Sequence, residues 1–327
     1  MDLVVLERVR ADVALVRFLC TNPGRRMLRE APVAAAELFG TEVLADLRTI
    51  FRAVAAAGGW TGMLEGSESP LAIAELSTDE VAITERALRR VRVRPVAAAR
   101  HGGFDSARRG DTEYLVDYLA ALNATRGPAQ QAAGSIAGEI AKRIGGRVQQ
   151  RPEKAPEVAC LKAVGKFDGD AARVLDLAAV RIIHHDRAAL YQAVDQLLDD
   201  ARVRVVGYVD RFADAAAITR IGAPVGGLDA WGPKRSAYRD ILVICRLSEA
   251  YLPRVSAGPL PPLEYFEVQL ITEHIAAAIA REHPLHAWRR LVIAEAKRAR
   301  RPATVRERAF VRACDEWSRQ WFQDGVA

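Results

Sequence analysis

The sequence predicts an α+β fold in which a mixed β-sheet is flanked by helices and preceded by a helical N-terminal region. Residues 1–145 are patterned as helices, residues 174–272 contain four short β-type runs, and residues 275–323 return to helical spacing. Helices and strands that are segregated along a chain favour a mixed sheet with helices packed against it.

Five helices are expected before residue 145. The first covers residues 1–20, and the second runs from Thr41 to Gly58. The third begins at a capping box, Ser77 to Glu80, in which hydroxyl and carboxylate satisfy free amides reciprocally. The fourth follows Asp111, and the fifth lies between the helix-breaking pair at 127–128 and the glycines at 145–146.

The pattern changes after residue 150. Strands are expected over 174–184, 202–212, 238–247 and 264–272, with an amphipathic helix over 187–200 between the first two. Residues 213–236, rich in glycine, are expected to form a long loop, and a proline-rich connection covers 253–262. Two helices follow, over 275–300 and 304–323.

Composition describes a globular chain without a membrane span. The 327 residues are 50% hydrophobic and 27% charged, and no run of eighteen apolar residues lacks a charge. Charges also interrupt residues 1–20, which excludes a secretory signal. Four widely spaced cysteines predict free thiols in a reducing cytoplasm and no zinc site. A net charge of +6 and a pI of about 9.3 favour acidic partners such as nucleotides or RNA.

Two of the β-type runs carry an acidic residue that a buried strand ordinarily avoids. Asp176 is expected to open the strand at 174–184, and Glu267 lies within the strand at 264–272. Two carboxylates on neighbouring strands can hold a divalent cation and the phosphates of a nucleotide. The structural alternative is a strand-end acceptor for Asp176 and an edge-strand surface charge for Glu267. Because Asp176 is not expected to fill the core, its replacement by Asn is expected to cost little stability.

Four motifs follow one another in this region: D-L-x-x-x-R-I-I from 176, D-R-F-A from 210, Y-R-D-I-L from 238 and E-V-Q-L from 267. In this order they resemble the RelA/SpoT-type nucleotide pyrophosphokinase (alarmone synthetase) domain, as a divergent member, with a small toxin-type member as one alternative. The resemblance covers about residues 150–290 and implies a nucleotidyltransferase-like synthetase core.

The resemblance implies a magnesium-dependent transfer of pyrophosphate from ATP to the 3′-hydroxyl of a purine nucleotide, as in (p)ppGpp or (p)ppApp synthesis. Asp176 would bind Mg²⁺, and Glu267 would assist the metal or act as a base. The cations expected to bind ATP are Lys162, Lys166, Arg181 and Arg211, with Arg151 and Lys154 as an extension. A lone pair of lysines four residues apart is more often solvated surface.

The acceptor side is expected at Tyr238, Arg239 and Gln269, with Tyr238 stacking on the purine. An ordinary half-buried tyrosine is the alternative for Tyr238. This side also departs most from the family pattern. Five positions differ: Val158 and Asp240 each stand for a serine, Ala237 for a glycine, Leu242 for a histidine and Ile271 for an arginine.

The expected organisation is a helical N-terminal region at 1–145, a synthetase core at 146–300 and a C-terminal helix at 301–327. Two other readings remain open: pyrophosphorylation of the tRNA 3′ end, which the basic stretch at 297–302 would suit, and an inactive nucleotide-sensing or protein-binding module. The helical N-terminus would serve as a neutralising antitoxin-like lid, a homo-oligomer contact or a partner-recognition part. The expected location is the cytoplasm.

Overall fold

The structure is a computed structural model that describes residues 41–66, 71, 75–92, 99–213, 217, 234–251 and 262–323. The helix expected over residues 1–20 lies outside the described residues. So do most of the loop expected over 213–236 and most of the connection over 253–262.

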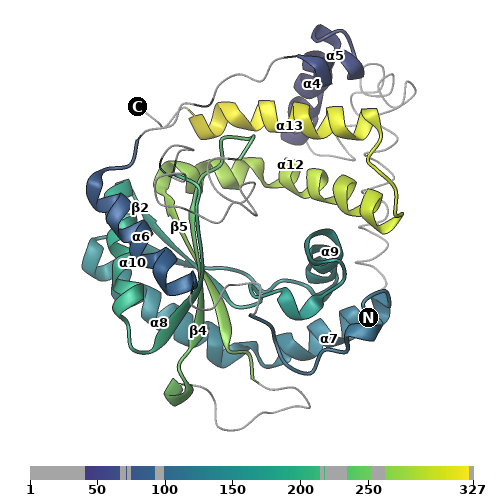
Figure 1. Ribbon diagram of the computed structural model, residues 1–327. Helices are drawn as coiled ribbons and strands as arrows, with labels where there is room; N and C mark the ends of the chain where they lie inside the picture. Colours follow the sequence, from purple (N-terminus) through teal and green to yellow (C-terminus); the bar gives the residue numbers. More distant parts are fainter. Residues whose placement is uncertain are drawn as a thin grey trace.

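A five-stranded sheet forms the centre of the fold (Figure 1). Its spatial order is β1-β2-β5-β4-β3. Strands β2 and β5 run parallel, whereas the other neighbouring pairs are antiparallel. The sheet is therefore mixed and the predicted α+β class is confirmed. The strands are β1 (Arg147–Gln150), β2 (Ala179–His184), β3 (Val203–Asp210), β4 (Ile241–Leu247) and β5 (Tyr265–Thr272).

Strand β5 occupies the middle of the sheet, and every residue in it except Thr272 is buried. A strand covered on both faces loses the alternation of apolar and polar residues that a half-exposed strand shows. Glu267 and Gln269 are thus polar side chains inside a buried strand. Such groups need partners, because an unpaired buried polar group costs free energy.

Two strand starts differ from the prediction. Strand β2 begins at Ala179, so Asp176 does not open the strand but lies in the turn before it, where Val174 N bonds to Ala171 O at 3.1 Å. Strand β4 begins at Ile241, because a turn closed by Ala237 N on Lys234 O at 2.7 Å holds the preceding residues outside the ladder. Strand β1 was not predicted; it is a short edge strand with one apolar residue, Val148.

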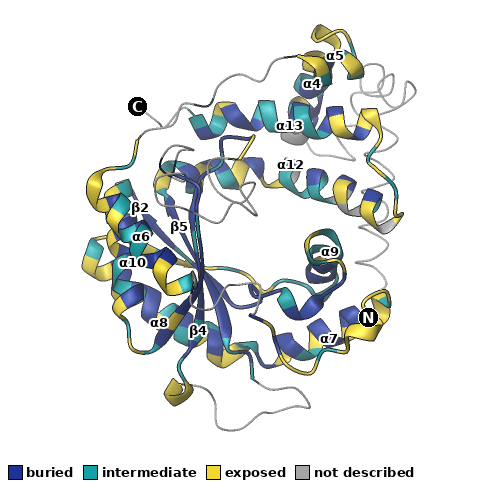
Figure 2. Ribbon diagram, viewed as in Figure 1, coloured by how far each residue is buried: buried dark blue, intermediate teal, exposed yellow. Residues whose placement is uncertain are grey.

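Three helices cover one face of the sheet: α6 (Thr78–Arg92), α8 (Arg126–Ile144) and α10 (Arg187–Asp199). Helix α8 lies against β1, β2 and β5 and buries alanines four residues apart. Small side chains at that spacing let the helix backbone come close to the strands. The buried residues of this face belong to the largest apolar cluster of the described chain (Figure 2).

Several predicted helix ends are confirmed, but the break expected at Gly127 and Pro128 is wrong: both lie in the first turn of α8, where proline costs no helical hydrogen bond. Ser77 N donates to Glu80 Oε2 at 2.7 Å and Glu80 N donates to Ser77 Oγ at 3.3 Å, which is the capping box at the start of α6. The Asp111 carboxylate accepts from Tyr114 N and begins the next helix. Gly145 ends α8 with φ of 76°, a left-handed conformation that glycine adopts without strain.

Helices α7 (Thr112–Ala124), α9 (Pro156–Phe167) and α12 (Glu273–Arg298) lie on the other side of the sheet (Figure 1). Helix α9 packs against α7 and α12, and α12 contacts β2 and β5. The segment that leads from α9 into β2 contains a short 3₁₀ turn, Ala171–Arg173, which contacts α9 and α7. Asp176 follows this turn.

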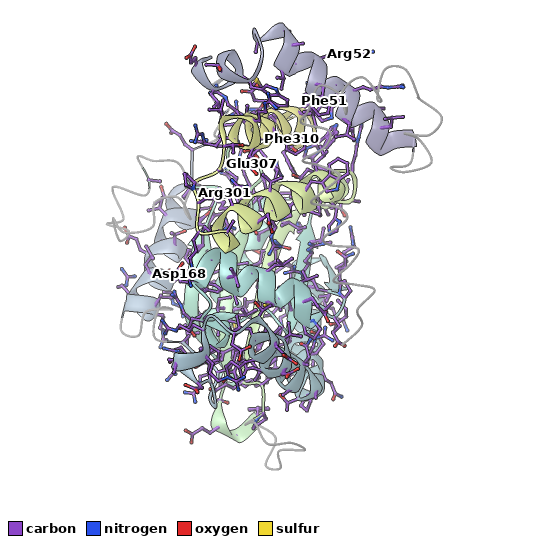
Figure 3. All side chains as sticks on the ribbon, turned by 90° about the vertical axis from the view of Figure 1, so that its right-hand side faces the viewer. Phe51, Arg52, Asp168, Arg301, Glu307 and Phe310 are labelled. Carbon is purple, nitrogen blue, oxygen red and sulfur yellow. The ribbon has the colours of Figure 1, made fainter. Side chains whose placement is uncertain are left out.

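A second apolar cluster joins the two ends of the described chain. Helices α4 (Thr41–Ala56) and α5 (Trp60–Glu65) pack on α13 (Val305–Gln323), with Phe51 and Phe310 in contact at a ring-centroid distance of 6.4 Å (Figure 3). Helices α6, α7 and α8, by contrast, share the cluster of the sheet. The division at residue 145 stays a prediction.

None of the described helices is long and apolar enough to cross a membrane.

Candidate active site

Asp176 is a buried carboxylate held by two lysines. Lys154 Nζ donates to Asp176 Oδ2, and Lys162 Nζ lies 2.7 Å from Oδ1. Asp176 is 7% exposed. Burial alone would raise the pKa of this carboxyl, but the charges of Lys162 and Lys154 outweigh burial and hold the pKa well below its ordinary value. Asp176 is therefore ionised at neutral pH.

Lys154 is paired and yet has a lowered pKa. Burial disfavours its ammonium form, and the neighbouring charge of Lys162 adds to that effect, so that its pKa falls to about 8 despite the attraction of Asp176. Two ammonium groups sharing one carboxylate leave a net positive charge at this point. A phosphate group would be attracted to it.

Glu267 is the second buried carboxylate and is 5% exposed. It pairs in register with Ala179, the first residue of β2, and Arg151 Nη1 donates to its Oε1 at 2.6 Å. Arg151 N in turn donates to Ala179 O at 3.2 Å, which fixes the arginine beside the start of β2. Burial lowers the pKa of Arg151, whereas Glu267 and Asp176 raise it to a net value above normal. Both carboxylates thus act on the same guanidinium.

A third buried carboxylate, Asp240, was not predicted as part of the site. It is 1% exposed and accepts from Arg211 Nη1, from Tyr238 OH at 2.7 Å and from Gln269 Nε2 at 2.8 Å. Burial raises the pKa of Asp240, but Arg211 and Lys234 bring it below its ordinary value. Arg181 Nε continues the chain of contacts by donating to Gln269 Oε1 at 2.5 Å.

Asp240 stands where the resembling family has a serine, in a segment that also has alanine in place of glycine. Ala237 nevertheless has φ of 62°, the left-handed conformation that glycine favours. The backbone turn is thus kept without glycine. In place of the serine hydroxyl, the Asp240 carboxylate supplies a charged acceptor that bonds to Arg211, Tyr238 and Gln269.

Tyr238 lies in the segment before β4 and not on the strand. Its ring meets Phe322 edge-on at a centroid distance of 5.5 Å, and Lys234 Nζ lies 4.6 Å from the ring centroid. A purine that stacks on the ring face next to Lys234 would have to displace the Lys234 ammonium. The stacking role stays a prediction.

A cleft with a volume of about 1150 Å³ opens between the start of α9, the segment before β4 and α12. A cleft of this size is larger than the usual site of a single small molecule. Cations predominate on its walls; those that line it are Arg151, Lys154, Arg181, Lys234, Arg235, Arg289 and Arg290, with His283 and His286.

Of the residues predicted from the sequence, Arg151, Lys154, Arg181 and Tyr238 line this cleft. Asp176 and Glu267 do not line it but are bonded to residues that do: Lys154 holds Asp176, and Arg151 holds Glu267. Gln269 bonds to Arg181 and Tyr238, Arg211 joins them through Asp240, and Lys162 pairs with Asp176. Arg239 does not line the cleft; burial and the charge of Arg187, on the face covered by α10, lower its pKa.

Lys166 lies one helical turn beyond Lys162 and is exposed to solvent. Burial of its neighbourhood, followed by the charges of Lys162, Arg290 and Arg211, lowers the pKa of Lys166 to about 8. The residues that sequence reasoning missed are Asp240, Lys234 and the cleft-facing cations of α12. Asp240 departs from the family motif, and the α12 residues carry no motif.

The family that the motifs resemble implies that magnesium binds at this site. In the described part of the chain, no group of three or more His, Cys, Asp or Glu side chains is arranged to hold a metal ion. Asp176 Oδ1 is buried, and its charge is met by the Lys162 ammonium at 2.7 Å. Mg²⁺ commonly takes one or two carboxylates together with substrate phosphates and water. Asp176 and Glu267 are of the carboxylate type that such a metal takes, and each is paired with a cation: Asp176 with Lys154 and Lys162, and Glu267 with Arg151.

Two solved structures similar to this chain are crystal structures of the small alarmone synthetase 1 from Bacillus subtilis. The first, bound to its product pppGpp, is 18% identical with a TM-score of 0.34, and the match covers 57% of this chain and 89% of that one. The second is 17% identical with a TM-score of 0.35, over 59% and 88% of the two chains. No protein-family model and no curated protein matches the sequence.

Proposed function

We propose that the cleft transfers a pyrophosphate group from ATP to the 3′-hydroxyl of a purine nucleotide. The observation that carries this proposal is the pair Asp176 and Glu267. Asp176 is buried in the turn before β2, and Glu267 is buried in β5 opposite the first residue of β2. Lys154 and Lys162 hold Asp176, Arg151 holds Glu267, and Arg151 and Lys154 also line the cleft. The four sequence motifs also support the proposal, because they resemble those of a family that carries out this transfer.

The reaction needs positioning and charge neutralisation more than covalent chemistry. The acceptor 3′-oxygen forms a bond to the β-phosphorus of ATP, the bond from that phosphorus to the oxygen bridging it to the α-phosphorus breaks, and AMP leaves with the bridging oxygen. The hydroxyl proton passes to a base. Glu267 is the candidate for that base, because its carboxylate is buried in β5 and held in place by Arg151.

The cations of the cleft would take the negative charge of the phosphates. Arg151 and Lys154 line the wall next to the two carboxylates, and Lys162 points at Asp176. Bound Mg²⁺ would be held by Asp176 and Glu267 and would neutralise charge on the phosphate oxygens. Arg181, Gln269 and Asp240 form a connected polar wall on the acceptor side.

The test is a transfer assay with purified protein and γ-labelled ATP, given GDP, GTP, ADP, AMP or deacylated tRNA in separate reactions. Label in one purine nucleotide, with equimolar AMP and loss of the reaction in EDTA, supports the proposal. Label in tRNA alone would move the acceptor to the tRNA 3′ end. No label in any acceptor, with ATP binding intact, would overturn the proposal in favour of a nucleotide-binding module.

A further inference from the structure

Arg290 on α12 is a cation of the cleft that has no partner among the residues the structure describes. It lines the cleft and is half-buried. Among the described residues its guanidinium makes no hydrogen bond or ion pair, although it offers five donors. Burial lowers its pKa, and Arg151 lowers it further against the opposing effect of Asp176. Arg290 thus lies close enough to Asp176 and Arg151 for their charges to change its pKa.

Other basic residues of the same helix are occupied. Arg289 is bonded to Glu282 and lies 2.6 Å from Asp315, Arg281 stacks over the Trp321 ring at 4.6 Å, and Lys297 Nζ donates to Gly165 O. These contacts fix α12 against α13 and α9. Arg290 therefore differs from these three basic residues of α12, each of which has a contact within the described part of the chain.

His286 lies one turn before Arg290 and also lines the cleft. Burial lowers its pKa to about 3, and the charges of Lys234, Arg290, His283 and Lys166 act in the same direction. A neutral imidazole surrounded by cations from α9, α12 and the segment before β4 marks a point of concentrated positive charge. Such a concentration is unfavourable unless an anion compensates it.

We propose that Arg290 and His286 bind the phosphate chain of a nucleoside triphosphate, so that α12 supplies a phosphate subsite in addition to the cations of α9 and of the segment after β1. Arg290 donates from its guanidinium to phosphate oxygens, and His286 donates from its ring N–H. This inference deepens the proposed function and takes the class of its ligand from it.

The site is tested by calorimetric binding to the full chain, with inorganic tripolyphosphate, ATP and adenosine as separate probes. Arg290→Gln is expected to weaken binding of tripolyphosphate and ATP about tenfold or more, because a charged hydrogen bond is worth about 1.5–3 kcal/mol and about 1.4 kcal/mol is tenfold. Adenosine binding should be unchanged. Arg281→Gln is the matched control, with the same charge change on the same helix outside the cleft.

Four outcomes would overturn the subsite. The first is that Arg290→Gln binds tripolyphosphate and ATP as tightly as the unaltered protein, and the second is that Arg281→Gln loses as much affinity as Arg290→Gln. The third is that Arg290→Gln loses as much affinity for adenosine as for ATP. The fourth is that the unaltered protein binds neither tripolyphosphate nor ATP. Arg290→Lys should retain more affinity than Arg290→Gln. A second measurement needs no variant: phenylglyoxal should modify Arg290 in the unaltered protein, and tripolyphosphate should protect it, as read by peptide mass spectrometry.

The subsite and the proposed function fail separately. If no acceptor takes label but Arg290→Gln still loses tripolyphosphate binding, the subsite stands and pyrophosphate transfer is wrong. If transfer is found and Arg290→Gln binds ATP normally, transfer stands and the subsite is wrong.

Discussion

Arg151 and Glu267 form a 2.6 Å ion pair that joins the residue following β1 to the central strand β5. The arginine backbone is fixed by the first residue of β2, so this pair holds a cation beside β5, which carries Glu267, and beside the start of β2, which follows Asp176.

Replacing Asp176 by Asn is expected to lower stability, in contrast to the expectation from the sequence. The carboxylate is buried, and its loss leaves Lys154 and Lys162 without their counter-charge. Breaking a buried pair of this kind costs about 3 kcal/mol or more. Urea unfolding at pH 7 measures the change, with the exposed Glu113→Gln as a control that should stay within about 0.5 kcal/mol. Equal midpoints for Asp176→Asn and the unaltered protein would show that the pairs contribute nothing.

The same carboxylate should contribute to acid unfolding. Its pKa in the folded chain is well below the ordinary value, so its stabilising contribution is complete above the unfolded pKa and is lost as pH falls through the folded pKa. Between pH 5 and pH 2, the free energy of unfolding should fall less steeply in Asp176→Asn than in the unaltered protein. Parallel curves would contradict the lowered pKa.

Polyphosphate binding is expected to take up protons near pH 8. Lys234 is itself exposed, but its enclosed surroundings, with the charges of Arg211, Lys166 and Arg289, lower its pKa to about 7 against the opposing effect of Asp240, so this lysine is mostly neutral at pH 8. A bound polyanion favours the charged form and raises the pKa. Calorimetry in two buffers of different ionisation enthalpy should show net uptake that is reduced in Lys234→Gln. Affinity should fall as pH rises from 7 to 9. Absence of uptake at pH 8 would contradict the prediction.

Tyr191 should stabilise the fold through a buried carboxylate away from the cleft. Its hydroxyl donates to Asp210 Oδ2 at 2.8 Å, and Asp210 also accepts from the backbone of Phe212 at 2.8 Å. Tyr191→Phe leaves a buried acceptor with one partner fewer and should cost about 1–3 kcal/mol in urea unfolding. Tyr114→Phe, whose hydroxyl lies at an exposed contact with Asp105 N, is the control. A smaller loss for Tyr191→Phe than for the control would contradict this role.

Tyr238→Ala should weaken use of the acceptor more than use of ATP, since stacking contributes about 1–3 kcal/mol per base. The structure adds a second function to this side chain, because its hydroxyl holds Asp240. Tyr238→Phe separates the two: it keeps the ring and removes the hydroxyl. KM values for acceptor and ATP should show a rise confined to the acceptor in Tyr238→Ala and a smaller one in Tyr238→Phe. Equal rises for both substrates would rule out the stacking role.

The sequence predicted the elements whose signals are local. The capping box at Ser77, the cap at Asp111 and the four longer strands follow from residue type and spacing alone. Strand β1 escaped prediction because Arg147, Gln149 and Gln150 are polar residues of an exposed edge. The start of β2 was misplaced because apolar Val174 and Leu175 are buried in a turn, which periodicity cannot distinguish from a strand.

The site was predictable to the extent that family motifs mark it. Asp176, Glu267 and Lys162 lie in such motifs, whereas Asp240 replaces a motif residue. Arg290 comes to the cleft only because α12 packs on α9. Tertiary packing of this kind brings together residues more than 100 positions apart, and no pattern within either segment records it.

The most direct test of the two-carboxylate site is the rate of label transfer from γ-labelled ATP to the accepted nucleotide in Asp176→Asn and Glu267→Gln, measured at a temperature where both variants are folded. Each variant is expected to lose about 100-fold or more of the rate, because each removes charge placed at the reacting phosphates. The control Glu113→Gln should keep the full rate. A rate near that of the unaltered protein in either folded variant would contradict the assignment of that carboxylate to the active site.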